Sequence, residues 1–178
     1  MTNKEDLIWY VCYGSNLCYE RFMCYLTDEE NKKLHIKKYE GSHKTPDKSA
    51  PRKSLIIEIP YEMYFGFKMG TTNWGDSGVC FLRRNENPNA HTVARAYLIT
   101  KDQYKHVWYR EGTDDSWYGH EIPLGFIGDI KAATFTSSFD IEEGLPCKDY
   151  LDVLKLGLSE CGKSEEFIEQ YLKERGVR

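Results

Sequence analysis

Two short stretches of the chain carry residue types that can bind an anion and move a proton. The first is the run Tyr13–Leu17, which reads Tyr-Gly-Ser-Asn-Leu and follows an apolar segment near the N-terminus. A Gly-Ser-Asn turn between a strand and a helix presents backbone N–H groups, which can hold a carboxylate or an oxyanion. The second is Glu111, a carboxylate at the end of an apolar helical stripe. Together they suggest a binding loop and an acid–base group.

The position of Glu111 follows from the helix that precedes it. A Thr-x-x-Gln capping box at residues 100–103 begins a helix whose apolar stripe runs to Trp108, and Glu111 takes the next place on that stripe. Gly112 suits the left-handed position after a helix, so Glu111 should lie at the helix C-terminus. The helix dipole and partial burial among aromatic side chains would both raise the pKa of Glu111, as proton-transfer catalysis requires. The alternative, that Glu111 only pairs with Arg110 or with solvent, stays open.

The elements around the N-terminal loop follow from hydrophobic periodicity. The segment Leu7–Tyr13 is apolar nearly throughout, which predicts a central strand covered on both faces. Ser15 or Asn16 should cap a helix whose apolar stripe ends at Leu26. A second short helix is predicted from Thr27, because Thr27 and Glu30 have capping-box spacing.

The rest of the chain is predicted to contain strands and loops, followed by helices at the C-terminal end. The basic, breaker-rich segment 37–53 is expected to be a solvated, flexible loop, with a phosphate-binding loop as the alternative. The C-terminal part, 147–175, should form two helices that cover one side of the sheet. Strands are predicted at Ser54–Ile59, Tyr61–Met69, Gly78–Arg84, Val93–Ile99 and Gly128–Ser137.

Composition limits the class of protein. The chain has 178 residues, which favours a single domain over 1–178. It carries 24 Lys and Arg against 28 Asp and Glu, and this balance argues against nucleic acid or an anionic membrane as a partner. No stretch has signal-peptide character or membrane-spanning length, so we expect a cytoplasmic protein.

Cysteine and histidine spacing predicts neither a metal site nor a cofactor. The six cysteines contain no C-x-x-C pair and lie mostly in apolar runs, which favours buried, reduced thiols. The five histidines form no metal-binding pair. A thiol hydrolase that uses Cys147 or Cys12 is the least favoured alternative, since a reactive thiol needs a nearby histidine or a helix N-terminus.

Three stretches resemble the gamma-glutamylcyclotransferase family, in the family's order. They are Tyr10–Leu17, the strand Ala96–Thr100 with its helix ending at Tyr109–Gly112, and the helix start Pro146–Tyr150 with Gly157 and Cys161–Gly162 after it. The resemblance implies an α+β fold, built on a closed or nearly closed small mixed β-barrel with helices packed outside. A pocket would lie between the loop and the helix that carries the glutamate.

The resemblance also implies an activity. Family members cleave gamma-glutamyl amides by internal cyclisation, which releases 5-oxoproline and an amine or amino acid. No cofactor or metal is needed, and the partner would be a small gamma-glutamyl substrate. The family's catalytic glutamate matches Glu111, its substrate-cradling loop matches Tyr13, Gly14, Ser15, Asn16 and Leu17, and a substrate-contacting tyrosine of the C-terminal helix matches Tyr150.

This reaction fits the residues that spacing alone singled out. The substrate's own α-amine attacks its γ-carbonyl, so the protein gains mainly by holding a folded conformer and needs no nucleophile of its own. Segment 37–53 and the insertion-like Thr113–Pro123 match no family landmark, and both could line the leaving-group side of the pocket. The leaving group and the oligomeric state stay open. The alternative function is a non-catalytic module that binds a small molecule on the same fold.

Overall fold

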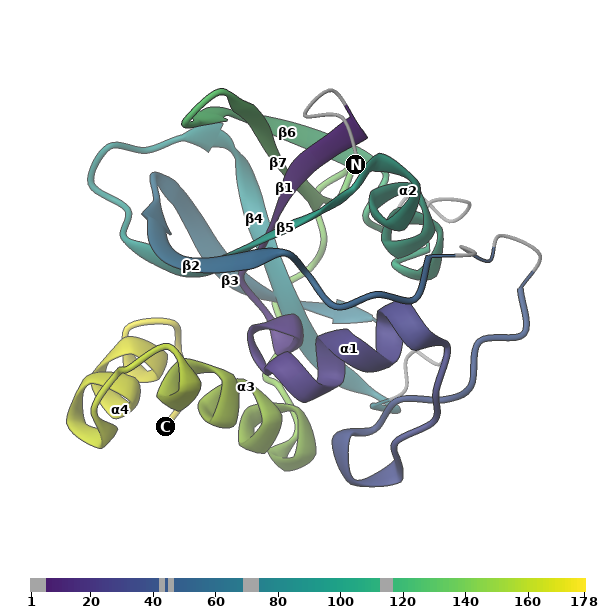
Figure 1. The fold of residues 1–178 in the computed structure, drawn as a ribbon. Helices are drawn as coiled ribbons and strands as arrows, with labels where there is room; N and C mark the ends of the chain where they lie inside the picture. The colour runs from purple at the N-terminus through teal and green to yellow at the C-terminus, as the bar shows by residue number, and fades with distance from the viewer. Residues whose placement is uncertain (1–5, 42–43, 45–46, 69–73, 113–116) are drawn as a thin grey trace.

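The computed structural model describes residues 6–41, 44, 47–68, 74–112 and 117–178 of the chain. Their strands form a five-stranded sheet in the order β2-β5-β1-β7-β6 and a two-stranded sheet, β3-β4 (Figure 1). The first sheet is mixed, because β1 runs antiparallel to β5 and parallel to β7. The strands are β1 Leu7–Cys12, β2 Lys53–Ile59, β3 Tyr61–Lys68, β4 Ser77–Glu86, β5 Thr92–Thr100, β6 His120–Ile127 and β7 Ile130–Thr136.

Strand β1 is central, as its continuous apolar character predicted. The four residues 9–12 are all buried, and partner strands flank β1 on both sides. Aromatic stacking fixes one of its faces, since the ring of Tyr10 stacks on Phe22 of α1 and on Phe135 of β7. The loop after β1 therefore starts from the most constrained part of the molecule.

The α+β class is confirmed, but the two sheets do not close into a barrel. Between β4 and β7 the junction is made by a side chain and not by a backbone ladder. Thr136 Oγ1 donates to Leu82 O at 2.7 Å and accepts from Leu82 N at 2.9 Å. One hydroxyl thus supplies both hydrogen bonds that a neighbouring strand would otherwise give at this point.

The helices follow the predicted order, with two corrections. Neither Ser15 nor Asn16 caps the first α-helix, because both lie in a separate 3-10 turn and Cys18 precedes the helix without a side-chain cap. Thr27 does not begin a second helix: it ends α1, its hydroxyl donates to Met23 O at 3.0 Å, and Asp28 follows in the left-handed region at φ 61°. Asn31 caps the next turn instead, by accepting from two backbone N–H groups. The helical segments are η2 Ser15–Leu17, α1 Tyr19–Thr27, η3 Lys32–Leu34, α2 Lys101–Arg110, α3 Lys148–Glu160 and α4 Glu165–Lys173.

Helix α2 has the ends that the sequence predicted. The Thr100 and Gln103 side chains and backbones form a reciprocal capping box at its start. Glu111 is the C-cap residue, and Gly112 follows at φ 86°. The capping box and the glycine together determine where the helix stops, and so where Glu111 lies.

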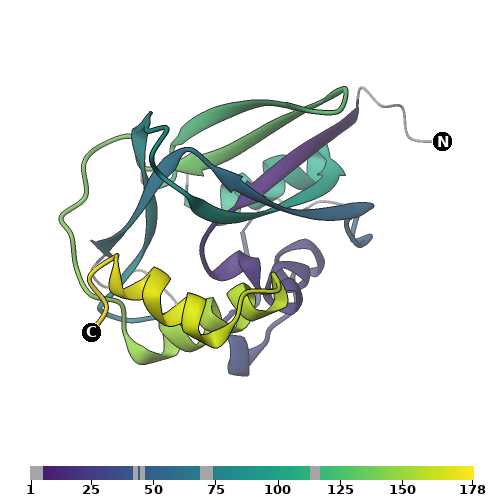
Figure 2. The ribbon, with the colours of Figure 1, turned by 90° about the vertical axis from the view of Figure 1, so that its left-hand side faces the viewer.

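The C-terminal helices α3 and α4 lie beneath the strands, with α3 next to α1 and α4 on the far side of α3 (Figures 1 and 2). Helix α3 approaches the loop after β1 closely at Gly157, where an added Cβ would lie 2.6 Å from Cys18 N and 2.6 Å from Leu17 Cβ. Among the described residues, no helix has both the length and the apolar character that crossing a membrane requires.

Strand β6 was missed, because its sequence lacks the usual strand pattern. It contains Pro123 and Gly125, its register shifts between Pro123 and Phe126, and most of its residues are at least partly exposed. Such irregularity is tolerated here because β6 is an edge strand. It takes up the end of the segment Thr113–Pro123, of which residues 113–116 lie outside the described part. The predicted end of the Tyr61–Met69 strand also lies outside it.

Replacing Thr136 with valine tests the bridge between the sheets. Valine keeps the shape of the side chain but leaves the buried N–H and C=O of Leu82 without this partner. We expect the free energy of unfolding to fall by about 2–4 kcal/mol, measured by denaturant unfolding. Thr27→Val, which removes only a hydrogen bond within a helix, is the control and should cost less than half as much. Equal losses in both variants would contradict the bridging role.

Candidate active site

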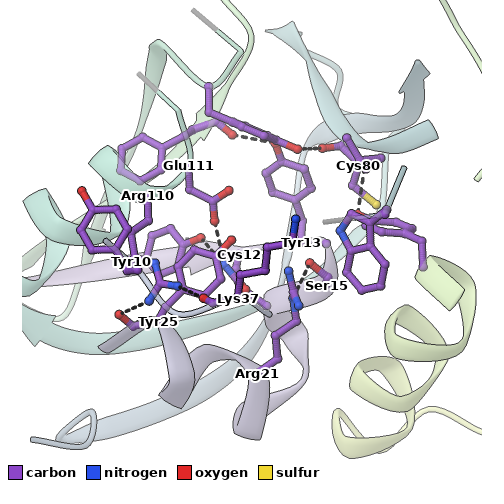
Figure 3. A pocket seen from close by; sticks show the side chains of 18 of the residues that line it. Tyr10, Cys12, Tyr13, Ser15, Arg21, Tyr25, Lys37, Cys80, Arg110 and Glu111 are labelled. Carbon is purple, nitrogen blue, oxygen red and sulfur yellow. Dashed lines mark hydrogen bonds between the residues drawn. The ribbon is translucent and has the colours of Figure 1, made fainter. Parts of the chain in front are cut away.

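A cavity of about 310 Å³ lies between the loop after β1 and the end of α2 (Figure 3). Its walls come from six parts of the chain that the sheet brings together. They are the loop 13–16, α1, β4, β7, the end of α2 and the first turn of α3. The lining is completed by Tyr10 and Cys12 of β1, residues 37–40, Trp74 and Tyr118.

The predicted loop and the predicted glutamate meet in this cavity. Asn16 Nδ2 donates to Glu111 Oε1 at 2.8 Å, and Figure 3 shows the Glu111 carboxylate pointing toward the loop that carries Tyr13 and Ser15. Because a carboxylate accepts and does not donate, this contact defines which end of the Asn16 amide is the NH₂ group. Asn16 is 5% exposed, and its Oδ1 has no hydrogen-bond partner among the described residues.

The loop itself is a single 3-10 turn. Leu17 N donates to Gly14 O at 2.9 Å and Cys18 N donates to Ser15 O at 3.2 Å. The turn thus uses the N–H of Leu17, whose side chain is fully buried and does not line the cavity. The N–H groups of Ser15 and Asn16 open the turn, where helical segments have no internal partner for their donors.

Three tyrosines, of which Tyr13 and Tyr150 are buried and Tyr118 is partly buried, line the cavity. Tyr150 accepts a hydrogen bond from Cys80 N at 2.9 Å, and Tyr118 donates to Cys80 O at 2.8 Å. Tyr13 donates to Phe135 O at 2.6 Å. Burial raises the pKa of all three phenols well above 10, so they are neutral hydrogen-bonding groups at neutral pH. Tyr150 therefore lines the cavity with its hydroxyl anchored to β4, and its contact with a substrate stays a prediction.

Gly14 leaves the space that these side chains need. A Cβ at this position would lie 3.0 Å from the Tyr150 hydroxyl and 3.1 Å from Cys80 Cβ. A larger residue would push the loop away from β4 and from the first turn of α3. The absence of a side chain at Gly14 therefore lets the loop pack closely against Tyr150 and Cys80.

Residues 37–40 line the cavity, so the start of segment 37–53 lies at the pocket, as the sequence suggested it could. Arg110 holds this segment in place: it donates to Lys37 O at 3.3 Å, and to Cys24 O and Tyr25 O at 2.9 Å each. Its guanidinium also lies 5.1 Å from the Tyr39 ring. The start of segment 37–53 is thus tied to the end of α2 by Arg110. Residues 42–43 and 45–46 of the segment lie outside the described part.

Arg21 is a cavity residue that sequence reasoning missed. It lines the cavity, is 2% exposed, and donates through Nε to Ser15 Oγ at 3.1 Å. The signal was present, because Arg21 falls three residues after Cys18 and four before Tyr25, on the inward stripe of α1. A charged residue on an apolar stripe marks a polar site, just as Glu111 does on α2.

The cavity contains no activated thiol among the described residues. Cys12 and Cys80 line it, and burial raises the pKa of Cys80 to about 12 and that of Cys12 well above its ordinary value. Cys147 caps α3 and lies outside the lining. No histidine of the described residues lines the cavity, and no cluster of three possible metal ligands was found among them.

Comparison with known proteins places the fold. No protein-family model matches the chain. Histone deacetylase 5 from Arabidopsis thaliana is 28% identical over 203 residues, which cover 93% of this chain but 30% of that protein. The chain thus spans less than a third of the length of this curated relative.

Solved structures match along nearly the whole chain. A gamma-glutamyl cyclotransferase superposes with a TM-score of 0.66 at 17% identity, over 92% of this chain and 85% of that one. An uncharacterized protein from Homo sapiens gives 0.65 at 18%, over 93% and 86%. A yeast gamma-glutamyl cyclotransferase specific to glutathione gives 0.51 at 12%, over 94% and 95%. The chain has the gamma-glutamyl cyclotransferase-like fold, so the resemblance seen in the sequence is confirmed at the level of the fold.

Replacing Gly157 with alanine should disturb the packing of α3 against the loop after β1. The added methyl meets backbone atoms of Leu17 and Cys18, so α3 must move away from the 3-10 turn. We expect a loss of about 1–3 kcal/mol in unfolding free energy, measured by denaturant unfolding. Leu156→Ala, at an exposed position of the same helix, is the control. A neutral Gly157→Ala variant would show that the contact is not a constraint.

Alkylation under native conditions tests the thiol alternative. Cys12 and Cys80 should stay unmodified by iodoacetamide at pH 7.5, because both are buried and only the thiolate reacts. The partly exposed Cys147 is expected to react first, as intact-mass and peptide mass spectrometry would show. A denatured sample, in which all six thiols react, is the control. Rapid native modification of Cys80 that a ligand prevents would revive a thiol mechanism.

Proposed function

We propose that this protein is an enzyme that cleaves a gamma-glutamyl amide by intramolecular acyl transfer and releases 5-oxoproline and an amine or amino acid. The observation that carries the proposal is the 2.8 Å contact between Asn16 Nδ2 and Glu111 Oε1. It brings a carboxylate to a turn whose first N–H groups can stabilise negative charge, within one cavity. The fold, shared with gamma-glutamyl cyclotransferases, supports the same assignment.

In this mechanism Glu111 acts first as general base and then as general acid. Its carboxylate removes a proton from the substrate's α-ammonium, and the freed amine attacks the γ-carbonyl carbon. A C–N bond forms, the carbonyl electrons move to oxygen, and a five-membered tetrahedral intermediate results. As the intermediate collapses, the original amide C–N bond breaks and Glu111 returns the first proton to the departing nitrogen. The freed Glu111 carboxylate then takes the second proton from the ring nitrogen and passes it to the departing amine, which leaves as an ammonium ion. Atoms and charge balance with no nucleophile from the protein.

The loop would stabilise the negative charge that develops on the carbonyl oxygen. The N–H groups of Ser15 and Asn16 are the donors placed for this task, and each such donor typically contributes about 3 kcal/mol to the transition state. The N–H of Leu17 is engaged by Gly14 O, so Leu17 supports the turn and Gly14 gives it room. The unpartnered Asn16 Oδ1 would accept a hydrogen bond from the α-ammonium group.

The cavity fits a small substrate held in a folded conformer. About 310 Å³ is at the lower end of the range for ligand pockets, and it suits a dipeptide-sized amide. Holding the amine next to the carbonyl is the main catalytic demand, since orientation alone can remove about 7–11 kcal/mol of a barrier in intramolecular reactions. Tyr13 and Tyr150, as neutral and anchored side chains, would form rigid walls against the glutamyl group.

We propose further that the enzyme is cytoplasmic, a single domain over 1–178, and independent of cofactors. The mild negative charge of the chain, −4, fits a small-molecule enzyme better than a nucleic-acid or membrane-surface protein. The activity named for the Arabidopsis relative is not proposed here, because most of that protein lies outside the match.

Glu111→Gln is the decisive variant. Glutamine keeps the size of the side chain but cannot take up a proton, so the release of 5-oxoproline from a panel of gamma-glutamyl amides should fall by about 10²–10⁴-fold. Asp102→Asn, an exposed carboxylate on the same helix, is the control and should retain wild-type turnover. Chromatographic measurement of 5-oxoproline gives the rate.

Two outcomes would count against the proposal. Undiminished turnover by Glu111→Gln would remove the assigned mechanism. A saturable thermal-shift response of the wild-type protein to gamma-glutamyl amides, with no 5-oxoproline released from any of them, would favour the non-catalytic binding module.

A further inference from the structure

Arg21 is a buried cation whose partners in the described structure are all neutral. Its Nε donates to the Ser15 hydroxyl at 3.1 Å, and its Nη1 donates to the carbonyl of Leu34. Its guanidinium lies 4.6 Å from the ring of Trp74 and 5.8 Å from that of Tyr25. Within the described part of the chain, no carboxylate comes within the 4.0 Å of an ion pair with it.

The other well-buried arginines near the site are neutralised. The side chain of Arg110, 6% exposed, lies 3.6 Å from the equally buried carboxylate of Asp28. Arg95, with its side chain 12% exposed, pairs with Glu160 at 2.9 Å. Each of these two arginines thus has a carboxylate partner within the fold. Arg21 and Arg95 both contact the 3-10 turn, Arg21 through Ser15 Oγ and Arg95 through Leu17 O at 2.7 Å, but only Arg95 has a carboxylate partner in the described structure.

A buried charge without a counter-ion is costly, and proteins rarely keep one without a use for it. Neutral hydrogen bonds and ring contacts offset only part of the lost hydration. Because Arg21 lines the cavity, an anionic group of a ligand can supply the missing charge there. A guanidinium presents a planar fork of donors that matches a carboxylate, and the ring of Trp74 holds that plane in place.

The other charged residues of the lining also favour a negatively charged ligand. Its cations are Arg21, Lys37, Lys38 and Arg110, and its carboxylates are Glu40 and Glu111. With Arg110 bound to Asp28, the cations that face the cavity without an ion pair in the described structure are Arg21 and the two lysines of segment 37–40. The lining therefore has more cations than carboxylates, which suits an acidic substituent of the ligand.

We propose that Arg21 is the carboxylate-binding residue of this site and determines which gamma-glutamyl amides it accepts. The proposal rests on the proposed function and deepens it. With Arg21 binding a carboxylate, the N–H groups of Ser15 and Asn16 are left for the reacting carbonyl oxygen. Two carboxylates could occupy the position: the α-carboxylate of the glutamyl group, or one on the departing amine.

Three substrates distinguish these sources. They are gamma-glutamyl-alanine, its analogue with the glutamyl α-carboxylate changed to a carboxamide, and its analogue with the alanine carboxylate changed to a carboxamide. For the wild type, the carboxamide at the position that Arg21 binds should lower kcat/KM by about 10- to 100-fold, the usual worth of a charge-assisted hydrogen bond. The other carboxamide should change kcat/KM much less.

Arg21→Gln then identifies the residue that makes the discrimination. The variant should lose most activity on the parent substrate, yet the sensitive carboxamide should now cost less than about 3-fold, because its partner is gone. A merely structural Arg21 would lower kcat/KM equally for all three substrates and leave the ratios unchanged. Arg21→Lys, which keeps the charge without the fork, should retain part of the preference. Arg84→Gln, at an exposed ion pair with Asp140, is the matched control.

The outcomes separate the two proposals. Wild-type turnover that is indifferent to both carboxamides, or a preference that survives Arg21→Gln, overturns the role of Arg21 and leaves the proposed function intact. No turnover of any substrate overturns the proposed function. In that case, thermal shifts of the wild type with the same three compounds still test Arg21, since equal shifts with all three exclude carboxylate recognition. If Arg21→Gln does not fold, the kcat/KM ratios of the three substrates are compared between the wild type and Arg21→Lys. Identical ratios would then overturn the role of Arg21.

Discussion

The hydrogen bond between Asn16 and Glu111 joins the two halves of the site, and much of the structure serves to make it possible. Asn16 reaches the cavity because β1 is the central strand of its sheet and ends in a tight 3-10 turn. Glu111 reaches it because the capping box that starts α2 and the glycine that ends it fix the helix length. The Tyr97 hydroxyl, on β5, adds a bond to Asn16 O at 3.0 Å. Two elements far apart in sequence are thereby held against each other.

Sequence patterns predicted much of this arrangement, for a physical reason. The order of elements follows from local signals, namely apolar runs, caps and glycines, and most of those signals agree with the fold. Glu111 could be found because a carboxylate interrupted an apolar helical stripe. Arg21 interrupts the stripe of α1 in the same way, and the same argument applied to it would have located the opposite side of the cavity. Strand β6 could not be found, since an irregular edge strand needs no alternating pattern.

The way the two sheets meet could not be predicted, because it depends on side-chain hydroxyls that bind distant backbone. The edge of β4 that does not pair with β3 receives hydrogen bonds from Thr136 at Leu82, and from Tyr118 and Tyr150 at Cys80. No local property of a threonine or tyrosine indicates such a partner. These contacts turn a strand edge, which elsewhere would invite pairing with another strand, into a wall of the cavity. A closed or nearly closed barrel was expected. Where β4 and β7 would pair in a closed barrel, side-chain hydroxyl groups make the hydrogen bonds instead.

Arg110 gives the site a mechanical link. Its guanidinium is fastened to the carbonyl of Lys37, while its backbone immediately precedes Glu111 at the end of α2. Any displacement of the wall formed by residues 37–40 would therefore pull on the residue next to the acid–base group. The 37–40 wall of the cavity and the group proposed to move protons are thus connected through the side chain and backbone of one residue, Arg110, so a displacement of one would be transmitted to the other.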